Sequence, residues 1–254
     1  MGEIACSRFV GKTAVVTGGG SGFGAGIARR LAREGARVAI IDLKLDAARS
    51  VAEDLGGEAL AFEADVANNT AVEHMASAVL REFGKVDVLV NNAGVGHTPQ
   101  PLEDVPDELF DRIFHVNAKS VFLTSRHFVP AMKASGRGAI LNIASTGAVR
   151  PRPGLTWYNA SKGWMTAATR AMAIELAPSA IRVNAINPVA GDTPLLSTFM
   201  GGDSEEARAR MVASIPLGRL STPEDMAAAA AYLCSDEAAM VTGIALEVDG
   251  GRCI

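Results

Sequence analysis

Short apolar runs alternate along the chain with amphipathic stretches. The runs expected to form strands cover residues 12–17, 37–42, 59–64, 86–91, 139–144, 181–186 and 245–248. Several are apolar at almost every position, which is typical of parallel strands buried on both faces. Because helical patterns separate the strands, the sequence predicts repeated βαβ units in a single α/β domain over residues 1–254. The expected architecture is a doubly wound, seven-stranded parallel sheet with helices on both faces.

Apolar side chains between these runs recur every three to four residues, as on one face of a helix. Residues 23–31 show this period and are followed by a glycine. Thr70 and Glu73 have the spacing of a capping box at the start of a second helix. Residues 222–225 (TPED) give a cap, a first-turn proline and a capping acid for a late, alanine-rich helix.

A long insertion over residues 189–216 interrupts this rhythm between the sixth and seventh strands. It carries Pro194, a Gly201-Gly202 pair and a charged helical stretch. Long excursions of this kind are usually functional, so we expect a substrate lid. A peripheral helix pair without a role is the alternative.

Composition excludes several classes of protein. With 48% hydrophobic and 20% charged residues, the 254-residue chain has enough apolar surface for a folded core. A net charge of -4 makes nucleic acid an unexpected partner. No apolar run reaches the ~18 residues of a membrane span, and the first residues have no signal-peptide pattern. Cys6, Cys234 and Cys253 are expected to be free thiols in a reducing cytoplasm, and no cluster has metal-ligand spacing.

A glycine-rich turn joins the first strand to the first helix over residues 17–24 (TGGGSGFG). Such a turn lets the backbone approach a ligand, and the helix N-terminus then faces a pyrophosphate. Asp42 ends the next strand, where its carboxylate accepts ribose hydroxyls and repels a 2′-phosphate, so we expect NAD in preference to NADP. Lys44 is the nearest cation. For the glycine-rich turn, the alternative is a tight turn that binds no ligand. For Asp42, the alternative is a strand-end residue that caps the next helix.

Tyr158 and Lys162 are four residues apart and therefore share one face of a helix. A free tyrosine has a pKa near 10. A cation ~5 Å away at an effective dielectric of ~20 contributes ~3 kcal/mol, which lowers that pKa by about two units. The pair is therefore a candidate general base, with the Ser145 hydroxyl at the end of the fifth strand holding the substrate oxygen.

Five motifs occur in an order and spacing that resemble one known family. They are Thr17-Gly18-x-x-x-Gly22-x-Gly24, Asn91-Asn92-Ala93-Gly94, Asn117, Ser145 and Tyr158-Asn159-Ala160-Ser161-Lys162. The chain resembles the short-chain dehydrogenase/reductase family over essentially its whole length, and the resemblance implies a Rossmann fold.

The resemblance also implies a mechanism. Tyr158 acts as general base or acid, Ser145 orients the oxygen, and Lys162 lowers the pKa of Tyr158 and holds the nicotinamide ribose. Asn117, expected on the long central helix, holds a water that completes a proton relay. The implied activity is NAD(H)-dependent interconversion of a secondary alcohol and a ketone on a small or medium, mostly apolar substrate. A 3-oxoacyl-[acyl-carrier-protein] or acyl-CoA reductase is the alternative, and a catalytically silent NAD-binding scaffold is an alternative of another class.

The cofactor contacts expected from the loop and the resemblance extend across the chain. They are Gly18, Ser21, Gly22, Phe23, Gly24, Asp42, Leu43, Asp65, Val66, Asn91, Ala93, Gly94, Tyr158, Lys162, Pro188, Val189 and Thr193. Val189 replaces the glycine that the family usually has after this proline, and Val tolerates fewer backbone angles than Gly.

Three loops beyond the strand ends, over residues 95–101, 146–157 and 189–216, are expected to form the substrate pocket. The candidates are His97, Thr146, Arg150, Arg152, Trp157, Leu195, Leu196, Phe199 and Met200. The apolar start of the insertion favours an apolar substrate, although these residues also suit simple packing. Arg150 and Arg152 suit either an anionic group or solvated and intersubunit positions, and His97 is expected at the surface.

The helix that carries Tyr158 is apolar on more than one face, and such a helix is buried somewhere. Members of the resembled family commonly bury it against a second subunit. We therefore expect a homotetramer with two-fold interfaces.

Overall fold

The computed structural model describes residues 7–56 and 59–254, and it contains the predicted doubly wound fold. Seven parallel strands form one sheet in the order β3-β2-β1-β4-β5-β6-β7. Their bounds are β1 (Thr13–Thr17), β2 (Arg37–Asp42), β3 (Ala59–Glu63), β4 (Val88–Asn91), β5 (Gly138–Ile143), β6 (Ile181–Pro188) and β7 (Ala245–Val248). The order reverses between β1 and β4, which is where such sheets bind ligands.

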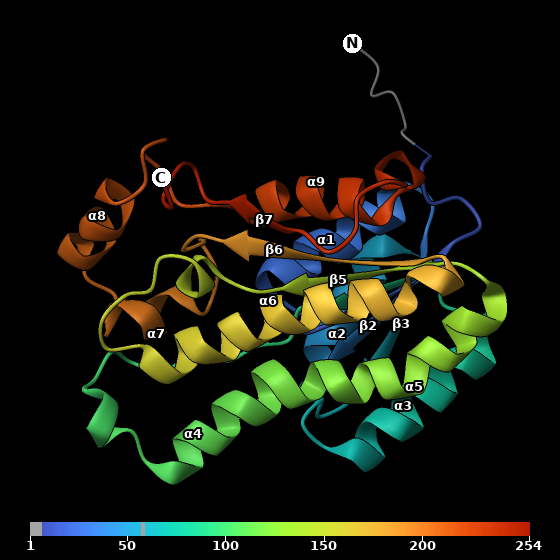
Figure 1. Cartoon of the computed structure of the whole chain (residues 1–254), viewed down its shortest axis with the longest axis horizontal. Coiled ribbons are helices and arrows are strands. Elements are labelled where there is room, and N and C mark those ends of the chain that lie inside the picture. Colours follow the sequence, from blue (N-terminus) through green and yellow to red (C-terminus); the bar gives the residue numbers. More distant parts are fainter. Residues whose placement is uncertain (1–6, 57–58) are drawn as a thin grey trace.

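Helices cover both faces of this sheet (Figure 1). One face packs against α1 (Gly22–Arg33), α2 (Leu45–Leu55) and α9 (Pro223–Cys234). The other packs against α3 (Asn69–Phe83), α5 (Ser120–Ser135) and α6 (Thr156–Leu176). Beyond the carboxyl ends of the strands, at the left of Figure 1, lie α4 (Asp107–Phe114), α7 (Leu196–Met200) and α8 (Glu205–Ala213).

Each face buries its own apolar core. Ile27 and Leu31 of α1 meet Met226 of α9 beneath the β1–β2 half of the sheet. Helices α1 and α9 lie so close together here that a Cβ added at Gly26 would be 2.6 Å from Pro223 Cβ. Packing of this kind fixes α1, and with it the turn that precedes the helix.

Of the two capping boxes predicted from the sequence, one is present and the other is not. Thr222 and Asp225 form the predicted capping box of α9. The capping box expected from Thr70 and Glu73 is wrong, because α3 begins at Asn69, two residues earlier than a cap at Thr70 would place it. Its cap is Asn68, whose side chain accepts the Ala71 N–H at 3.0 Å.

The excursion between β6 and α9 is tied at its base. Gly191 and Ser221 form an isolated parallel bridge, and the Asp192 N–H donates to Ser221 O at 2.9 Å. Between these points α7 and α8 share a small apolar core of their own, which consists of Val189, Leu196, Met211, Ile215 and Leu220. The excursion is therefore a compact unit, tied at its base and joined again to the C-terminal segment, where the Leu217 N–H donates to Gly250 O at 3.1 Å.

Among residues 7–56 and 59–254, no helix is long and apolar enough to cross a membrane. In the same part of the chain, no group of His, Cys, Asp and Glu side chains is placed to hold a metal ion. Cys234 and Cys253 form no disulfide, while Cys6 lies outside the described residues.

Candidate active site

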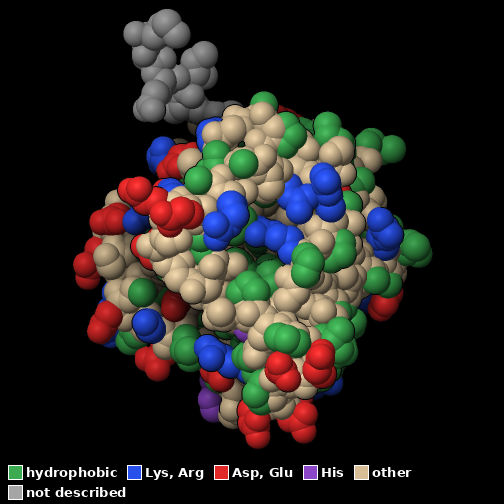
Figure 2. All heavy atoms as spheres, turned by 90° about the vertical axis from the view of Figure 1, so that its left-hand side faces the viewer, with side chains coloured by type: hydrophobic (Ala, Val, Ile, Leu, Met, Phe, Trp, Pro, Cys, Tyr) green, Lys and Arg blue, Asp and Glu red, His purple; other side chains and the backbone are tan. Residues whose placement is uncertain are grey.

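A cavity of about 980 Å³ opens at the carboxyl ends of the strands. Its size is at the upper end of the ~300–1,000 Å³ typical of small-molecule sites. The space-filling view of this end shows a hollow with Lys and Arg side chains gathered at its rim (Figure 2). Turns after β1 to β6 contribute lining residues, so one cavity joins the predicted dinucleotide loop to the predicted catalytic residues.

The turn after β1 is shaped by its glycines. Gly18 and Gly22 have φ angles of 61° and 51°, in the left-handed region that favours glycine. A Cβ at Gly18 would lie 2.9 Å from Ala93 Cα, and one at Gly24 would collide with the Gly18 carbonyl. Asn92 fixes the turn from the neighbouring strand, since its Nδ2 donates to Thr17 O and Gly18 O at 2.9 and 3.0 Å.

Helix α1 begins without a side-chain cap at Ser21, and its first turn carries no acidic residue. Its first N–H groups and the positive end of the helix dipole therefore suit an anion. A dinucleotide pyrophosphate fits this cradle.

Asp42 lies at the cavity edge with both carboxylate oxygens fixed. Oδ2 accepts the Gly20 N–H and Oδ1 accepts the Lys44 N–H, each at 3.0 Å. Each oxygen keeps a further lone pair for a ribose hydroxyl. Leu43 and Lys44 also line the cavity, so one cation lies near this carboxylate.

Two predicted cofactor contacts do not line the cavity: Gly24 and Asn91. Asn91 lies in the buried layer beneath it, where its Nδ2 donates to Asn142 Oδ1 at 2.9 Å and its Oδ1 accepts the Thr124 hydroxyl at 2.7 Å. Asn142 in turn donates to Thr169 Oγ1. This chain of buried hydrogen bonds joins β4, β5, α5 and α6 under the site. The other expected cofactor contacts line the cavity.

Ser145 lies two residues after β5, where its Oγ accepts the Gly147 N–H at 3.0 Å. The hydroxyl proton of Ser145 is thereby left to donate. It is placed toward Tyr158, because a hydrogen bond between the two side chains lowers the pKa of Tyr158. Both residues line the cavity, as predicted.

The expected lowering of the Tyr158 pKa by Lys162 is not observed in this structure. Burial is the largest influence and raises the pKa of Tyr158, while the Ser145 hydrogen bond and the charge of Arg152 partly oppose it. Desolvation disfavours a buried phenolate, and at Tyr158 it outweighs the favourable effect of nearby positive charge.

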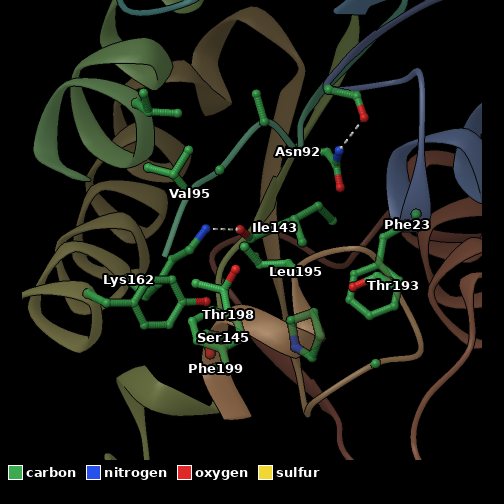
Figure 3. A pocket seen from close by; sticks show the side chains of 18 of the residues that line it. Phe23, Asn92, Val95, Ile143, Ser145, Lys162, Thr193, Leu195, Thr198 and Phe199 are labelled. Atoms are coloured by element: carbon green, nitrogen blue, oxygen red, sulfur yellow. Dashed lines mark hydrogen bonds between the residues drawn. The ribbon is translucent and has the colours of Figure 1, made fainter. Parts of the chain in front are cut away.

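The Lys162 ammonium group is held by a backbone carbonyl of β5. Its Nζ donates to Ile143 O at 2.8 Å (Figure 3) and lies 6.0 Å from the centroid of the Tyr158 ring. Burial lowers the pKa of Lys162 to about 8. The ammonium group is therefore still mostly charged at neutral pH.

Asn117 lies in a π-helical turn (His115–Lys119) between α4 and α5, rather than within a regular helix. Its Oδ1 accepts the Val95 N–H at 2.8 Å, and its Nδ2 donates to Val95 O and Ser161 Oγ at 2.9 and 3.0 Å. The side chain is fully buried and does not line the cavity. It remains close to the site, because a Cβ at Gly94 would lie 3.4 Å from both Asn117 Oδ1 and Lys162 Nζ.

The substrate side of the cavity contains six of the nine predicted candidates, namely Thr146, Arg150, Arg152, Leu195, Leu196 and Phe199. Phe199 of α7 reaches the catalytic residues, with its ring centroid 4.9 Å from that of Tyr158. Three candidates lie elsewhere. Trp157 donates to Leu102 O, and Met200 packs in the apolar core of the excursion. The prediction of a surface position for His97 is wrong, since this side chain is buried and its Nε2 has no partner.

Several further lining residues lie in the three loops that were expected to form the pocket: Val95, Gly147, Leu155, Ala190, Gly191, Pro194 and Thr198. Others were neither named as contacts nor part of those loops. They are Ala64, Ala67, Arg112, His115, Val116, Ile143, Ala144 and Asn159. Position after a strand was the available signal for most of them. Arg112 and His115 come from α4 and its π-helical extension, which no pattern in the chain marked.

Comparison with known proteins adds an independent line of information. A family model described as "Enoyl-(Acyl carrier protein) reductase" matches residues 18–252. The 4-formylbenzenesulfonate dehydrogenase TsaC1/TsaC2 of Comamonas testosteroni is 44% identical over 247 residues, which cover 96% of this chain and 98% of that protein. The cis-4-hydroxycyclohexanecarboxylate dehydrogenase of Sinomonas cyclohexanicum is 39% identical over 254 residues, with 99% and 98% coverage.

Among solved structures, a 3-ketoacyl-(acyl-carrier-protein) reductase from Brucella melitensis, complexed with NADH, is 53% identical to this chain. The match covers 96% of this chain and 99% of that one, with a TM-score of 0.93.

Proposed function

We propose that this chain, which belongs to the short-chain dehydrogenase/reductase family, is an NAD(H)-dependent oxidoreductase. It interconverts a secondary alcohol and a ketone on a small or medium, mostly apolar substrate. The observation that carries this proposal is the convergence of the Tyr158 hydroxyl, the Ser145 hydroxyl and the Lys162 ammonium group on a cavity that also includes the glycine-rich turn.

In the direction of oxidation, Tyr158 acts as the phenolate, after its own proton has passed to solvent, and takes the hydroxyl proton of the substrate. The Ser145 proton, left available by the Gly147 N–H, hydrogen-bonds the substrate oxygen. A positioned general base of this kind contributes about 10²- to 10⁴-fold to the rate. Lys162 supplies positive charge near the phenol, and its Nζ keeps two further N–H groups for a ribose hydroxyl or a water.

When bound, NAD⁺ supplies the hydride acceptor at C4 of its nicotinamide. The overall reaction converts the alcohol and NAD⁺ into the ketone, NADH and one proton. Because the Asn117 side chain already makes three hydrogen bonds, a relay water held at Asn117 would use its backbone or the second lone pair of Oδ1. The preference for NAD rests on Asp42, with Lys44 as the opposing charge.

The apolar part of the substrate would lie under Leu195, Leu196 and Phe199, so we assign the excursion over 189–216 as a substrate lid. One relative is named for a hydroxycyclohexane substrate, which is a secondary alcohol on an apolar ring. The second candidate is a 3-oxoacyl-[acyl-carrier-protein] or acyl-CoA reductase, which the 53% identical Brucella protein favours by its name. A silent NAD-binding scaffold is disfavoured by the intact Ser145, Tyr158 and Lys162 side chains.

Exposed apolar side chains support the expected homotetramer. Phe122 of α5 and Trp164 and Ile174 of α6 are 47%, 40% and 80% exposed on helices that flank the site. Exposed apolar surface of this kind is typical of subunit interfaces. Light scattering at micromolar concentration should give four chains, and a monomer would contradict the assignment. A cytoplasmic location belongs to the same proposal, supported by the unpaired Cys234 and Cys253.

The decisive experiment combines a cofactor titration with turnover. Titration of NADH with the wild-type protein should give a fluorescence change that saturates. The wild type should also reduce NAD⁺ when it is supplied with secondary alcohols from a panel of apolar compounds. Tyr158→Phe should lower kcat by at least about 100-fold while NADH binding changes little. Retention of most activity in Tyr158→Phe would remove Tyr158 as the base. Faster NADPH-dependent reduction of 3-oxoacyl thioesters than of simple ketones would favour the second candidate.

A further inference from the structure

The charged residues of the cavity are separated along the sheet. Its two carboxylates, Asp42 and Asp65, follow β2 and β3, on the dinucleotide side of the switch point. On the other side, the loop after β5 contributes Arg150 and Arg152 to the lining, and no Asp or Glu of the described chain lines that part. The substrate end of an otherwise largely apolar pocket is therefore positively charged.

Arg152 is a half-buried cation without a balancing charge. Burial lowers the pKa of Arg152, and the nearby positive charge of Arg252 lowers it further. No ion pair among residues 7–56 and 59–254 involves this side chain. Its backbone O accepts the Asn159 Nδ2–H at 3.0 Å, which holds the loop against α6. The positive charge of Arg152 lowers the pKa of Tyr158, so the guanidinium group lies within electrostatic reach of the Tyr158 hydroxyl.

The C-terminal residues bring a further arginine to this place. Arg150 Nη1 donates to Arg252 O at 2.7 Å and to Ile254 O at 3.2 Å, which ties this segment to the loop after β5. Arg252 Nη1 is buried without a hydrogen-bond partner. The oxygens of the neighbouring Asp249 accept the N–H groups of Gly251 and Cys253 at 2.9 and 2.7 Å, and among the described residues Asp249 forms no ion pair with Arg252.

An unpaired guanidinium that is half-buried beside a second cation is costly for the empty protein. An anion from a ligand would remove this cost and would gain charge-assisted hydrogen bonds, which a planar guanidinium forms with two oxygens at once. The reacting carbon must lie near Tyr158, so the anion belongs to another part of the same substrate.

We propose that Arg152, with Arg252 beside it and Arg150 holding the segment, forms a subsite for a terminal carboxylate or sulfonate of the substrate. This inference rests on the proposed function and narrows its substrate class to secondary alcohols or ketones that carry an anionic group beyond an apolar body.

Three isosteric alcohols test this subsite: 4-(1-hydroxyethyl)benzoate, the corresponding benzamide and the corresponding benzamidine, with their meta isomers to vary the reach. In the wild type, kcat/KM for the carboxylate should exceed that for the amide by at least about 10-fold, as for a hydrogen bond to a charged group. Arg152→Gln should bring this ratio close to one, mainly through KM, and Arg152→Glu should favour the amidinium compound. Arg49→Gln, an exposed arginine of α2 outside the cavity, should leave the ratio unchanged.

The ratio between two substrates of one variant cancels any effect of Arg152 on Tyr158. A direct readout is calorimetric binding of 4-acetylbenzoate and 4-acetylbenzamide to the NADH-loaded protein. The subsite is supported if the wild type binds the carboxylate more tightly than the amide and Arg152→Gln loses this difference. If such binding were found without any turnover, the absence of turnover would count against the proposed function alone. Equal binding of the carboxylate and the amide, together with equal kcat/KM for the corresponding alcohols, would overturn the subsite. Oxidation of both alcohols in that case would leave the proposed function intact.

Discussion

The ring of Phe199 lies against the ring of Tyr158, with centroids 4.9 Å apart and planes inclined by 57°. Phe199 belongs to α7 in the excursion, and Tyr158 belongs to α6 on the body of the fold. The residue that covers the pocket therefore also excludes water from the phenol. Since burial is the largest cause of the raised pKa of Tyr158, the excursion influences both the shape of the site and the proton affinity of Tyr158, the proposed base.

Replacing Phe199 should change the pH dependence in a defined direction. Phe199→Ala admits water to Tyr158, so the pKa of the phenol should fall toward its usual value and the rise of kcat/KM for alcohol oxidation should move to lower pH. The lost apolar contact should also lower kcat/KM for an apolar alcohol by about 10-fold. Phe199→Leu keeps apolar cover and should shift the profile less. An unchanged profile in Phe199→Ala would show that the ring does not control desolvation of the base.

Ser145→Ala should shift the same profile the opposite way. The Ser145 hydrogen bond lowers the pKa of Tyr158, so its removal should move the rise of kcat/KM to higher pH. Loss of a donor to the substrate oxygen should also reduce kcat by about 10²- to 10³-fold. Ser125→Ala is the matched control, because that hydroxyl is buried without a partner and lies outside the cavity. A shift to lower pH in Ser145→Ala would contradict this account.

Lys162 should make the stability of the cofactor-free protein depend on pH. Its pKa in the folded state is about 8, below the usual 10.5, because burial disfavours the charge. The unfolded chain therefore binds more protons between these values, and the free energy of unfolding gains up to about 3 kcal/mol as pH rises through this window. Below pH 8 this gain is absent.

The Lys162→Met variant lacks the titrating amine, so comparing it with the wild type isolates the contribution of Lys162 to the pH dependence of stability. The difference in unfolding free energy, wild type minus Lys162→Met, should increase between pH 8 and pH 10 in urea denaturation. A flat difference would mean that Lys162 is better solvated than its position indicates.

Asp42→Ser should relax the choice of coenzyme. Loss of a charged acceptor for the ribose hydroxyls should lower kcat/KM for NAD by about 10- to 100-fold, and loss of its repulsion should raise kcat/KM for NADP. Asp46→Ser, at an almost fully exposed position on α2, should change neither value. A wild type that prefers NADP would remove Asp42 as the determinant.

Much of the fold follows from the order of apolar runs. The strand predicted over 37–42 coincides with β2, and the one over 245–248 coincides with β7. Arg37 and Asp42 stand at the two ends of β2, and Asp249 follows β7, so local pattern was sufficient. The sixth strand extends two residues farther than predicted, to Pro188, since pairing with β7 continues there.

Side-chain environments were harder to predict because they depend on contacts between distant segments. Asn91 was expected at the cofactor, yet Asn142 and Thr124 take up its side chain in the buried layer. His97 is buried although its segment has no regular secondary structure. The pKa of Tyr158 moves opposite to the prediction because desolvation, which spacing does not reveal, exceeds the effect of nearby charge.

The bridge between Gly191 and Ser221 has a consequence for how such enzymes diverge. Since residues 192–220 depart from the body and return to it at one junction, and longer loops cost little additional closure entropy, this stretch can be exchanged or resized as a cassette. The turns after β1 to β4 and the Ser145, Tyr158 and Lys162 side chains lie outside this stretch and would persist through such exchanges, whereas Thr193 lies inside it. Selectivity toward new compounds can therefore evolve on one side of Tyr158 without re-evolving the redox chemistry on the other.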